Sequence, residues 1–267
     1  MSLKDIQTKA KLRSPRLVIF GGAGIGKTTW ASKMGNPIAI LTEDGLGTTD
    51  LPHFPLCTEW DKEPKDDKDK KLGVKQRLLE LLKNDHDYET LIIDSLDWLE
   101  KIIHDHTCKE NGWKSMESVG YGKSYKEALT TWREFLALTN ELRNSKNMVI
   151  CQICHSDVRT FHDPETESYD QYVLKLNKGA SSLVQENADA IFFLTYKKGT
   201  VKTQGGKGGD AMKVVQGDRT IYAEQSSSYL AKNRYQLPKE LPFDWSAIRE
   251  MIIKNSKAKS DGAETSK

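Results

Sequence analysis

The stretch at residues 16–30, RLVIFGGAGIGKTTW, limits the possible folds of this chain more than any other feature. Its apolar run at 17–20 is typical of a strand that is buried on both faces of a parallel sheet. The glycine-rich sequence that follows allows a tight backbone path on which successive N–H groups point toward an anion. Thr28 then begins a helix-forming run, whose first N–H groups are also free. The stretch predicts a strand, a phosphate-binding loop and a helix.

The loop also carries a specific nucleotide-binding pattern. Residues 21–28 match G-x-x-x-x-G-K-[ST] in full, with Lys27 and Thr28 at the last two positions. In this pattern the lysine reaches the β- and γ-phosphates, and the hydroxyl after it binds Mg²⁺. We therefore predict a site for ATP and Mg²⁺ in which Lys27 is also catalytic. The predicted nucleotide-binding residues of the loop are Gly21, Gly22, Ala23, Gly24, Ile25, Gly26, Lys27, Thr28 and Thr29.

Acidic residues follow two further apolar runs. The run at 91–93 ends in Asp94, and an acid at a strand end beside the phosphate loop holds Mg²⁺, usually through water. We predict that Asp94 and Thr28 are the Mg²⁺ ligands, with a simple turn-forming role of Asp94 as the alternative. Glu43 and Asp44 follow the other run, PIAIL. Glu43 is the predicted catalytic residue, because its longer side chain can reach an attacking water beyond the γ-phosphate. The alternative is that Glu43 and Asp44 are solvated carboxylates without a role.

Two side chains near the end of the fourth apolar run, MVICQIC, are candidates for sensing the γ-phosphate. His155 comes just after this run, whereas Gln152 should still lie inside the strand. We predict that His155 senses the γ-phosphate and moves the polar stretch that follows it. A surface histidine without a role is the alternative.

Composition limits the partners of the chain. Of its 267 residues 29% are charged, but the formal net charge is only +2, so any contact with nucleic acid must be confined to a patch or loop. The sequence has no secretory signal and no long apolar run, which predicts a cytoplasmic protein (in the host cytoplasm if phage-encoded) with no membrane partner. HDHTC at 104–108 and CQICH at 151–155 allow a zinc or haem site. We favour free thiols, because MVICQIC has the pattern of a buried strand.

The rest of the chain alternates apolar runs with helical spacing. This alternation predicts an α/β fold with a mostly parallel central sheet flanked by helices and a C-terminal β-hairpin extension. We expect a basic lead-in at 1–14, one domain at 15–250 and a disordered tail at 251–267. The polar stretch at 156–179 is too long for an idle connection. The Lys/Gly-rich segment at 197–213 predicts a mobile hairpin tip.

These motifs, taken in order, resemble the RecA-like ATPases. The phosphate loop, Glu43, LIIDS around Asp94 and the late AKNR follow the order seen in that family. AKNR is similar to the Lys-x-Arg element of the RecA and replicative-helicase branch, which reaches the nucleotide of a neighbouring subunit. The resemblance implies a RecA-like P-loop NTPase fold and a homo-oligomer with nucleotide at the subunit interface. It also implies catalytic roles for Lys232 and Arg234, and the alternative is an ordinary basic surface strand.

More narrowly, the chain resembles the phage-type nucleotide-binding proteins, core-only RecA-like ATPases of which some are single-strand annealing recombinases. YETLIIDSLDWLE, ASSLVQENADAIFFL and NRYQLP carry this resemblance over residues 11–245. The usual switch glutamine is matched by His155 rather than clearly by Gln152. The resemblance implies an ATPase of phage-type DNA recombination that binds single-stranded DNA as an oligomer, with a single-strand-binding or replication protein as a further partner.

Three functions stay open at this point. The leading one is the recombination ATPase, which DNA would stimulate. Its DNA contacts are expected in the segments at 156–179 and 197–213. The alternative for both segments is a simple solvated loop. The candidate DNA contacts are Lys197, Lys198, Lys202 and Lys207 for phosphates and Phe161, Tyr169 and Tyr172 for bases. The second is an ATP-dependent motor or loader that acts through a protein partner in DNA replication or repair. The third, a small-molecule kinase, is disfavoured because no arginine-rich lid is evident.

Overall fold

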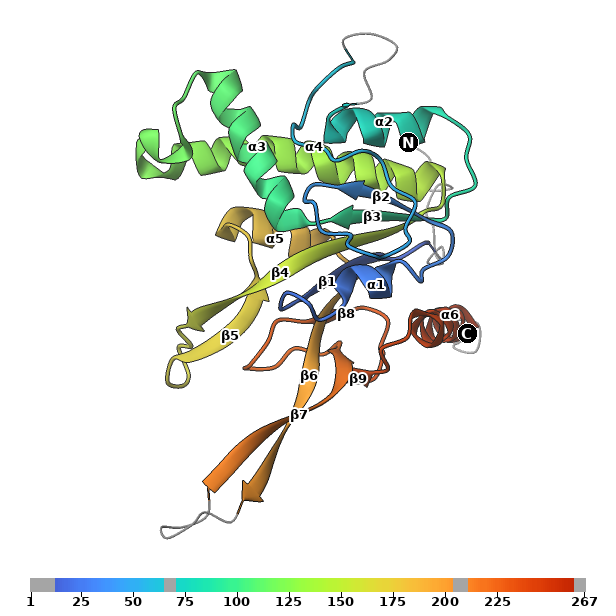
Figure 1. Cartoon of the computed structure of the whole chain (residues 1–267), viewed down its shortest axis with the longest axis vertical. Helices are drawn as coiled ribbons and strands as arrows, with labels where there is room; N and C mark the ends of the chain where they lie inside the picture. The colour runs from blue at the N-terminus through green and yellow to red at the C-terminus, as the bar shows by residue number, and fades with distance from the viewer. Residues whose placement is uncertain (1–12, 65–70, 204–210, 262–267) are drawn as a thin grey trace, which may run out of the picture.

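The computed structural model describes residues 13–64, 71–203 and 211–261 (Figure 1). Most of the predicted lead-in, Lys207 and the end of the predicted tail lie outside these ranges. A parallel sheet forms the centre of the described chain, as the alternating pattern predicts. Its strands are β1 (Arg16–Gly21), β2 (Pro37–Leu41), β3 (Thr90–Asp94), β4 (Val149–Phe161) and β6 (Ala190–Thr203).

These strands lie in the order β2-β3-β4-β1-β6, and each neighbouring pair is parallel. The strand that ends in Asp94, β3, is not a direct neighbour of β1, because β4 lies between them. This central position suits β4 because residues 150–154 are all buried, which a strand covered on both faces requires. The mostly parallel sheet with helices on both of its faces confirms the α/β class that the alternating pattern predicts.

Antiparallel strands extend this sheet. They are β5 (Tyr169–Leu174), β7 (Ala211–Tyr222), β8 (Lys232–Asn233) and β9 (Glu240–Leu241). β7 pairs with β6 and β9, β8 pairs with the start of β6, and β5 pairs with the outer half of β4. The β6–β7 hairpin confirms the predicted hairpin, although its tip at 204–210 lies outside the described residues. The alternative of a simple solvated loop at 156–179 does not hold, because residues 156–161 pair with 169–174 as two antiparallel strands.

Both hairpins continue past the end of β1. Gly21, the last residue of β1, lies level with His155 of β4 and with Leu194 of β6. β4 runs on to Phe161 and β6 to Thr203, so each hairpin starts beside the carboxyl end of β1. Figure 1 shows the two hairpins leaving this edge of the sheet as separate arms.

Helices cover both faces of the sheet. They are α1 (Lys27–Ala31), α2 (Val74–Lys83), α3 (Leu96–Asn111), α4 (Lys123–Ser145), α5 (Lys178–Asn187) and α6 (Trp245–Asp261), with short 3₁₀ turns η2 (Met116–Ser118) and η3 (Gly120–Gly122). Apolar residues of α2, α3, α4 and α5 pack on one face, where they meet Val18 and Phe20 of β1. α1 and α6 pack on the other face, against Leu17 and Ile19. No helix in the described ranges is long and apolar enough to cross a membrane.

The helix α6 corrects the predicted tail at 251–267. It continues to Asp261, so residues 251–261 are helical. Trp245, Ile248 and Ile252 are buried in the core beside α1, and their spacing places them on one helical face. The ring of Trp245 meets that of Trp30 edge-on, with centroids 5.8 Å apart. The Lys- and Ser-rich composition after residue 252 conceals the continuation of a helix that these three apolar residues anchor.

Candidate nucleotide site

The loop between β1 and α1 has the backbone that its glycine pattern predicts. Gly24 and Gly26 have φ angles of 75° and 97°, in the left-handed region that other residues rarely adopt. Gly21 packs so closely on β6 that an added Cβ would lie 2.3 Å from the carbonyl oxygen of Leu194. The loop therefore requires glycine at these three positions.

Lys27 is buried at the start of α1, with 6% of its surface exposed. Its Nζ donates hydrogen bonds to the carbonyl oxygens of Gly21 and Gly22, both at 3.1 Å, so the side chain bends back across the loop. Burial lowers the pKa of this ammonium group, whereas the nearby carboxylate of Asp94 raises it. A bound phosphate would add the negative charge that a buried cation needs.

Thr28 and Asp94 meet between α1 and β3, as predicted for a Mg²⁺ site. The hydroxyl of Thr28 donates to Oδ2 of Asp94 at 2.7 Å, and Asp94 is 5% exposed. Burial raises the pKa of Asp94, while the hydrogen bond from Thr28 lowers it. A carboxylate and a hydroxyl are oxygen donors of the kind that Mg²⁺ prefers, with water and phosphate filling its other positions. These residues fit the implied ion, whose charge would also favour ionised Asp94.

An open pocket of about 340 Å³ lies beside these groups. Its lining residues are Gly24, Gly26, Lys27, Thr28, Thr29, Glu43, Gly45, Leu46, Thr48, Thr49, Asp94 and His155. Of the two acids after β2, Glu43 lines the pocket, whereas Asp44 is exposed outside it. The fold thus brings Glu43 and His155 to the phosphate loop, and their catalytic roles stay predictions.

His155 is held by Asp97, which the sequence patterns do not single out. Asp97 is buried in the first turn of α3. Its Oδ1 accepts a hydrogen bond from the backbone N–H of His155 at 3.0 Å, and both carboxylate oxygens lie 3.1 Å from the ring Nδ1. Burial would raise the pKa of Asp97, but hydrogen bonds from His155 outweigh burial, and the pKa falls to about 2. With Nδ1 engaged, Nε2 is the ring nitrogen left for a ligand.

Gln152, the other candidate sensor, is buried inside β4, as its position in the sequence predicts. Cys151 and Cys154 are buried in the same strand, and burial raises the pKa of both thiols. The segment at 104–108 lies on α3. Across the described ranges, no three His, Cys, Asp or Glu side chains are placed to hold a metal ion together.

Lys232 and Arg234 lie at the opposite end of the strands from the pocket. β8 pairs with the first residues of β6, whereas the pocket lies at the carboxyl ends of the parallel strands. Nζ of Lys232 donates to the carbonyl oxygens of Gln185 and Glu186 at the end of α5. The half-exposed guanidinium of Arg234 donates to Asp189 at 3.3 Å. Contact with a neighbouring subunit's nucleotide stays a prediction.

Arg219 and Phe243 also lie against the phosphate loop, and no sequence pattern points to them. A Cβ added to Gly26 would lie 2.7 Å from Nη1 of Arg219 and 3.8 Å from Cζ of Phe243. These contacts depend on the pairing of β7 with β6 and on the path of the chain from β9 to α6. Neither feature can be read from local sequence.

Comparison with known protein families identifies one family for this chain. Residues 13–235 match the model of the AAA_24 family, whose description is "AAA domain". The chain belongs to this family. Among curated proteins, no relative matches it. Among solved structures it is similar to the flagellar accessory protein FlaH from Methanocaldococcus jannaschii, with 9% identity and a TM-score of 0.35, over 79% of this chain and 85% of that chain.

As an AAA-domain protein with a complete phosphate loop, the chain is a P-loop nucleotide-binding ATPase. The family match includes the loop, both pocket acids and the AKNR segment. Chemically, the pocket combines a buried cation, a Thr28–Asp94 pair suited to Mg²⁺ and the Glu43 carboxylate. Positioning and charge stabilisation by such groups account for most catalysis of phosphoryl transfer.

Proposed function

We propose that this ATPase acts in DNA recombination of the phage type and binds single-stranded DNA as an oligomer. The observation that supports this most is the position of the pocket between the roots of two β-hairpins. His155 stands at the root of the β4–β5 hairpin, level with Gly21. Arg219 lies against Gly26 at the root of the β6–β7 hairpin. A change in the bound nucleotide therefore acts where both hairpins begin, and such local changes can reposition a whole element.

In this proposal each pocket residue has one task. Lys27 neutralises the β- and γ-phosphates, and Thr28 and Asp94 hold Mg²⁺, which stabilises the charge on the phosphates when it is bound. Glu43 orients the attacking water and accepts its proton. Asp97 fixes the ring of His155 so that Nε2 is directed to the γ-phosphate.

The β6–β7 hairpin is the better candidate for contacts with DNA phosphates. On its described strands Asp218 is the only acid. The lysines on these strands are Lys197, Lys198, Lys202 and Lys213. Lys197 forms an ion pair with Glu240 of β9 in the isolated subunit. A few lysines neutralise a few phosphates, so each subunit alone should bind weakly and in a salt-dependent way.

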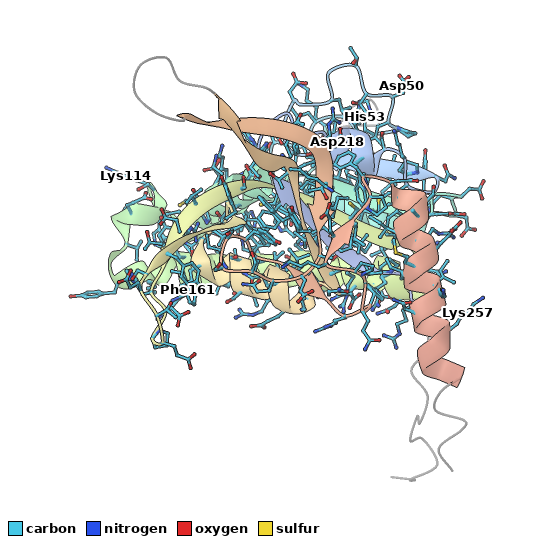
Figure 2. All side chains as sticks on the ribbon, turned by 90° about the horizontal axis from the view of Figure 1, so that it is seen from below. Asp50, His53, Lys114, Phe161, Asp218 and Lys257 are labelled. Atoms are coloured by element: carbon cyan, nitrogen blue, oxygen red, sulfur yellow. The ribbon has the colours of Figure 1, made fainter. Side chains whose placement is uncertain are left out.

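The β4–β5 hairpin has the opposite charge, with five acidic residues and one arginine between 156 and 174. Phe161 and Tyr169 pair on it with ring centroids 5.4 Å apart, and Phe161 is 47% exposed. Figure 2 shows Phe161 across the molecule from α6, away from Asp218 of the other hairpin. Tyr172 instead stacks on Phe193, with centroids 5.1 Å apart, so it belongs to the core. We therefore keep Phe161 and Tyr169 as base-stacking candidates, since stacking needs no cation.

An oligomer follows from the same proposal. Lys232 and Arg234 lie at one end of the strands and the pocket at the other. A head-to-tail assembly would bring one subunit's Arg234 to the nucleotide of the next and align the basic hairpins. A single-strand-binding or replication protein is the proposed further partner.

DNA-stimulated ATP hydrolysis tests the proposal. We expect the full chain to hydrolyse ATP slowly with Mg²⁺, and single-stranded DNA to raise the rate more than duplex of equal length. Lys198→Glu with Lys202→Glu should lower this stimulation severalfold, because like charges then face the phosphates. Lys123→Glu with Lys126→Glu, the same charge change on exposed sites of α4, is the matched control. A rate that single strands do not change would contradict the proposal.

The second candidate function is a motor or loader that acts through a protein partner in replication or repair. The acidic β4–β5 hairpin with its exposed Phe161 favours this alternative, because aromatic residues are enriched in protein interfaces. Under this hypothesis, a basic partner protein rather than DNA would raise the hydrolysis rate. Phe161→Ser would then abolish the effect of the partner.

A further inference from the structure

Arg219 and Phe243 form a small surface beside the phosphate loop, which we call the Arg219–Phe243 surface. The guanidinium carbon of Arg219 lies 5.5 Å from the centroid of the Phe243 ring. Both side chains pack against Gly26. A Cβ added to this glycine would lie 2.7 Å from Nη1 of Arg219 and 3.8 Å from Cζ of Phe243. Neither residue lines the pocket that contains Lys27, Glu43 and His155. The surface is therefore next to the phosphate site but outside it.

The guanidinium of Arg219 has no anionic partner in the described part of the chain. Arg219 is exposed, and it forms no hydrogen bond or ion pair with any described residue. Arginine commonly extends into solvent from such a position, but here it packs against the loop and an aromatic ring. Tyr196 lies directly opposite Arg219 in the β6–β7 pair, which places a second aromatic residue on the same face.

The position of Phe243 is fixed from the other side of the loop. Phe243 packs against the core beside α1, and Trp245 follows it at the start of α6. Because Trp245 packs edge-on against Trp30 of α1, the ring of Phe243 is tied to the helix that follows the phosphate loop. The surface is thus assembled from β7 and the start of α6, and both elements are anchored to the nucleotide-binding core.

We propose that the Arg219–Phe243 surface binds the nucleoside half of the nucleotide, with the base stacked on the guanidinium and the ring. This inference rests on the proposed ATP site. When the triphosphate occupies the loop and the pocket, the ribose and base must leave the loop on a side that the pocket does not use. A flat guanidinium and an aromatic ring both stack on planar heterocycles, and the guanidinium N–H groups can also donate to ribose oxygens.

Calorimetric titration with Mg²⁺-ATP, Mg²⁺-ADP and inorganic tripolyphosphate separates nucleoside contacts from phosphate contacts. Arg219→Lys keeps the positive charge but loses the flat guanidinium, and Phe243→Leu keeps an apolar side chain but loses the ring. Each variant should weaken ATP and ADP binding by the same factor, about tenfold, because both nucleotides share the nucleoside. Tripolyphosphate affinity should be unchanged, which also verifies that the variant is folded. Arg249→Lys, on the exposed side of α6, is the matched control.

Two results would overturn this inference. Unchanged affinity for ATP and ADP would mean that the surface does not meet the nucleotide. An equal loss for tripolyphosphate would mean that Arg219 contacts phosphates instead of the nucleoside. Failure of the unmodified chain to bind either ATP or tripolyphosphate is a different outcome, because it would remove the ATP site on which the inference rests.

Discussion

At the scale of single residues, Lys27 shows how the site is prepared for an anion. It is a buried cation whose hydrogen bonds go to two backbone carbonyl oxygens rather than to a carboxylate. Lys27→Ala should weaken ATP binding by about 10- to 100-fold, because a hydrogen bond to a charged group contributes roughly 1.5–3 kcal/mol. Lys33→Ala, an exposed position just after α1, is the matched control. Calorimetric titration measures both, and equal affinities would contradict the assigned role of Lys27.

Glu43 makes a prediction of a different kind, because it lines the pocket but does not belong to the loop. Glu43→Gln should keep ATP affinity within about twofold and lower turnover at least 100-fold, since the amide cannot take a proton from water. Asp44→Gln is the control, because Asp44 lies outside the pocket. Single-turnover hydrolysis together with nucleotide titration separates the two effects. Wild-type turnover in Glu43→Gln would show that another group positions the water.

The residues that could be predicted are those whose role depends on neighbours in sequence. Lys27, Thr28 and the loop glycines belong to one motif, and Asp94 is identified by the apolar run before it. Asp97 could not be predicted, because its contact with His155 depends on α3 beginning at Leu96 and packing beside β4.

At the scale of elements, Glu100 joins α3 to the start of α5. Its carboxylate accepts the backbone N–H of Asn177 at 2.9 and 3.0 Å. Burial raises the pKa of Glu100 to about 7. The hydrogen bond from the N–H of Asn177 and the charge of Arg159 lower this pKa, but burial has the larger effect. The folded chain therefore holds a proton that the unfolded chain releases near pH 4.5. Stability falls as the pH rises from about 4.5 through 7, by about 3 kcal/mol in total.

Glu100→Gln should remove this pH dependence and keep the carbonyl oxygen that accepts the N–H of Asn177. Urea unfolding at pH 5 and pH 8 measures the effect: the variant should gain stability relative to the wild type at pH 8 and not at pH 5. Glu110→Gln, at an exposed site on the same helix, should change neither value. A wild-type difference between the two pH values that survives in Glu100→Gln would have another origin.

Elements were predictable where a periodic apolar pattern continued to their ends. The buried strands β2 and β3 fall where this pattern predicts them. The second half of β4 is polar and exposed, so only its pairing with β5 makes it a strand. The end of α6 could not be predicted for a related reason, because its Lys- and Ser-rich composition is typical of a disordered tail although Trp245, Ile248 and Ile252 anchor the helix.

At the scale of the whole molecule, the distance between the pocket and Arg234 predicts a shared site between subunits. Arg234→Ala should leave a folded chain, since Asp189 keeps the bidentate contact of Arg16 and a hydrogen bond from Arg143. Nucleotide binding should persist while hydrolysis falls by about 1,000-fold or more, the usual scale for an arginine supplied in trans. Mixing Arg234→Ala with Glu43→Gln should restore part of the activity, because some interfaces then join intact residues. No recovery in subunits shown to assemble together would exclude a shared site.

The last prediction concerns the purpose of ATP in the assembly. Each subunit offers only a few lysines on the β6–β7 hairpin, so tight binding to single strands requires several hairpins to align. In the proposed assembly, nucleotide held between subunits would favour this alignment, because His155 and Arg219 lie beside the phosphate loop at the two hairpin roots. Binding of a labelled oligonucleotide, measured by anisotropy, should therefore be at least tenfold tighter with a non-hydrolysable ATP analogue than with ADP. It should also weaken steeply with salt and exceed binding to duplex of equal length.

Lys198→Glu with Lys202→Glu should reduce the salt dependence, and Lys123→Glu with Lys126→Glu should not. If the affinity is the same with the analogue, with ADP and without nucleotide, the recombination proposal fails and the partner-driven motor becomes the better account.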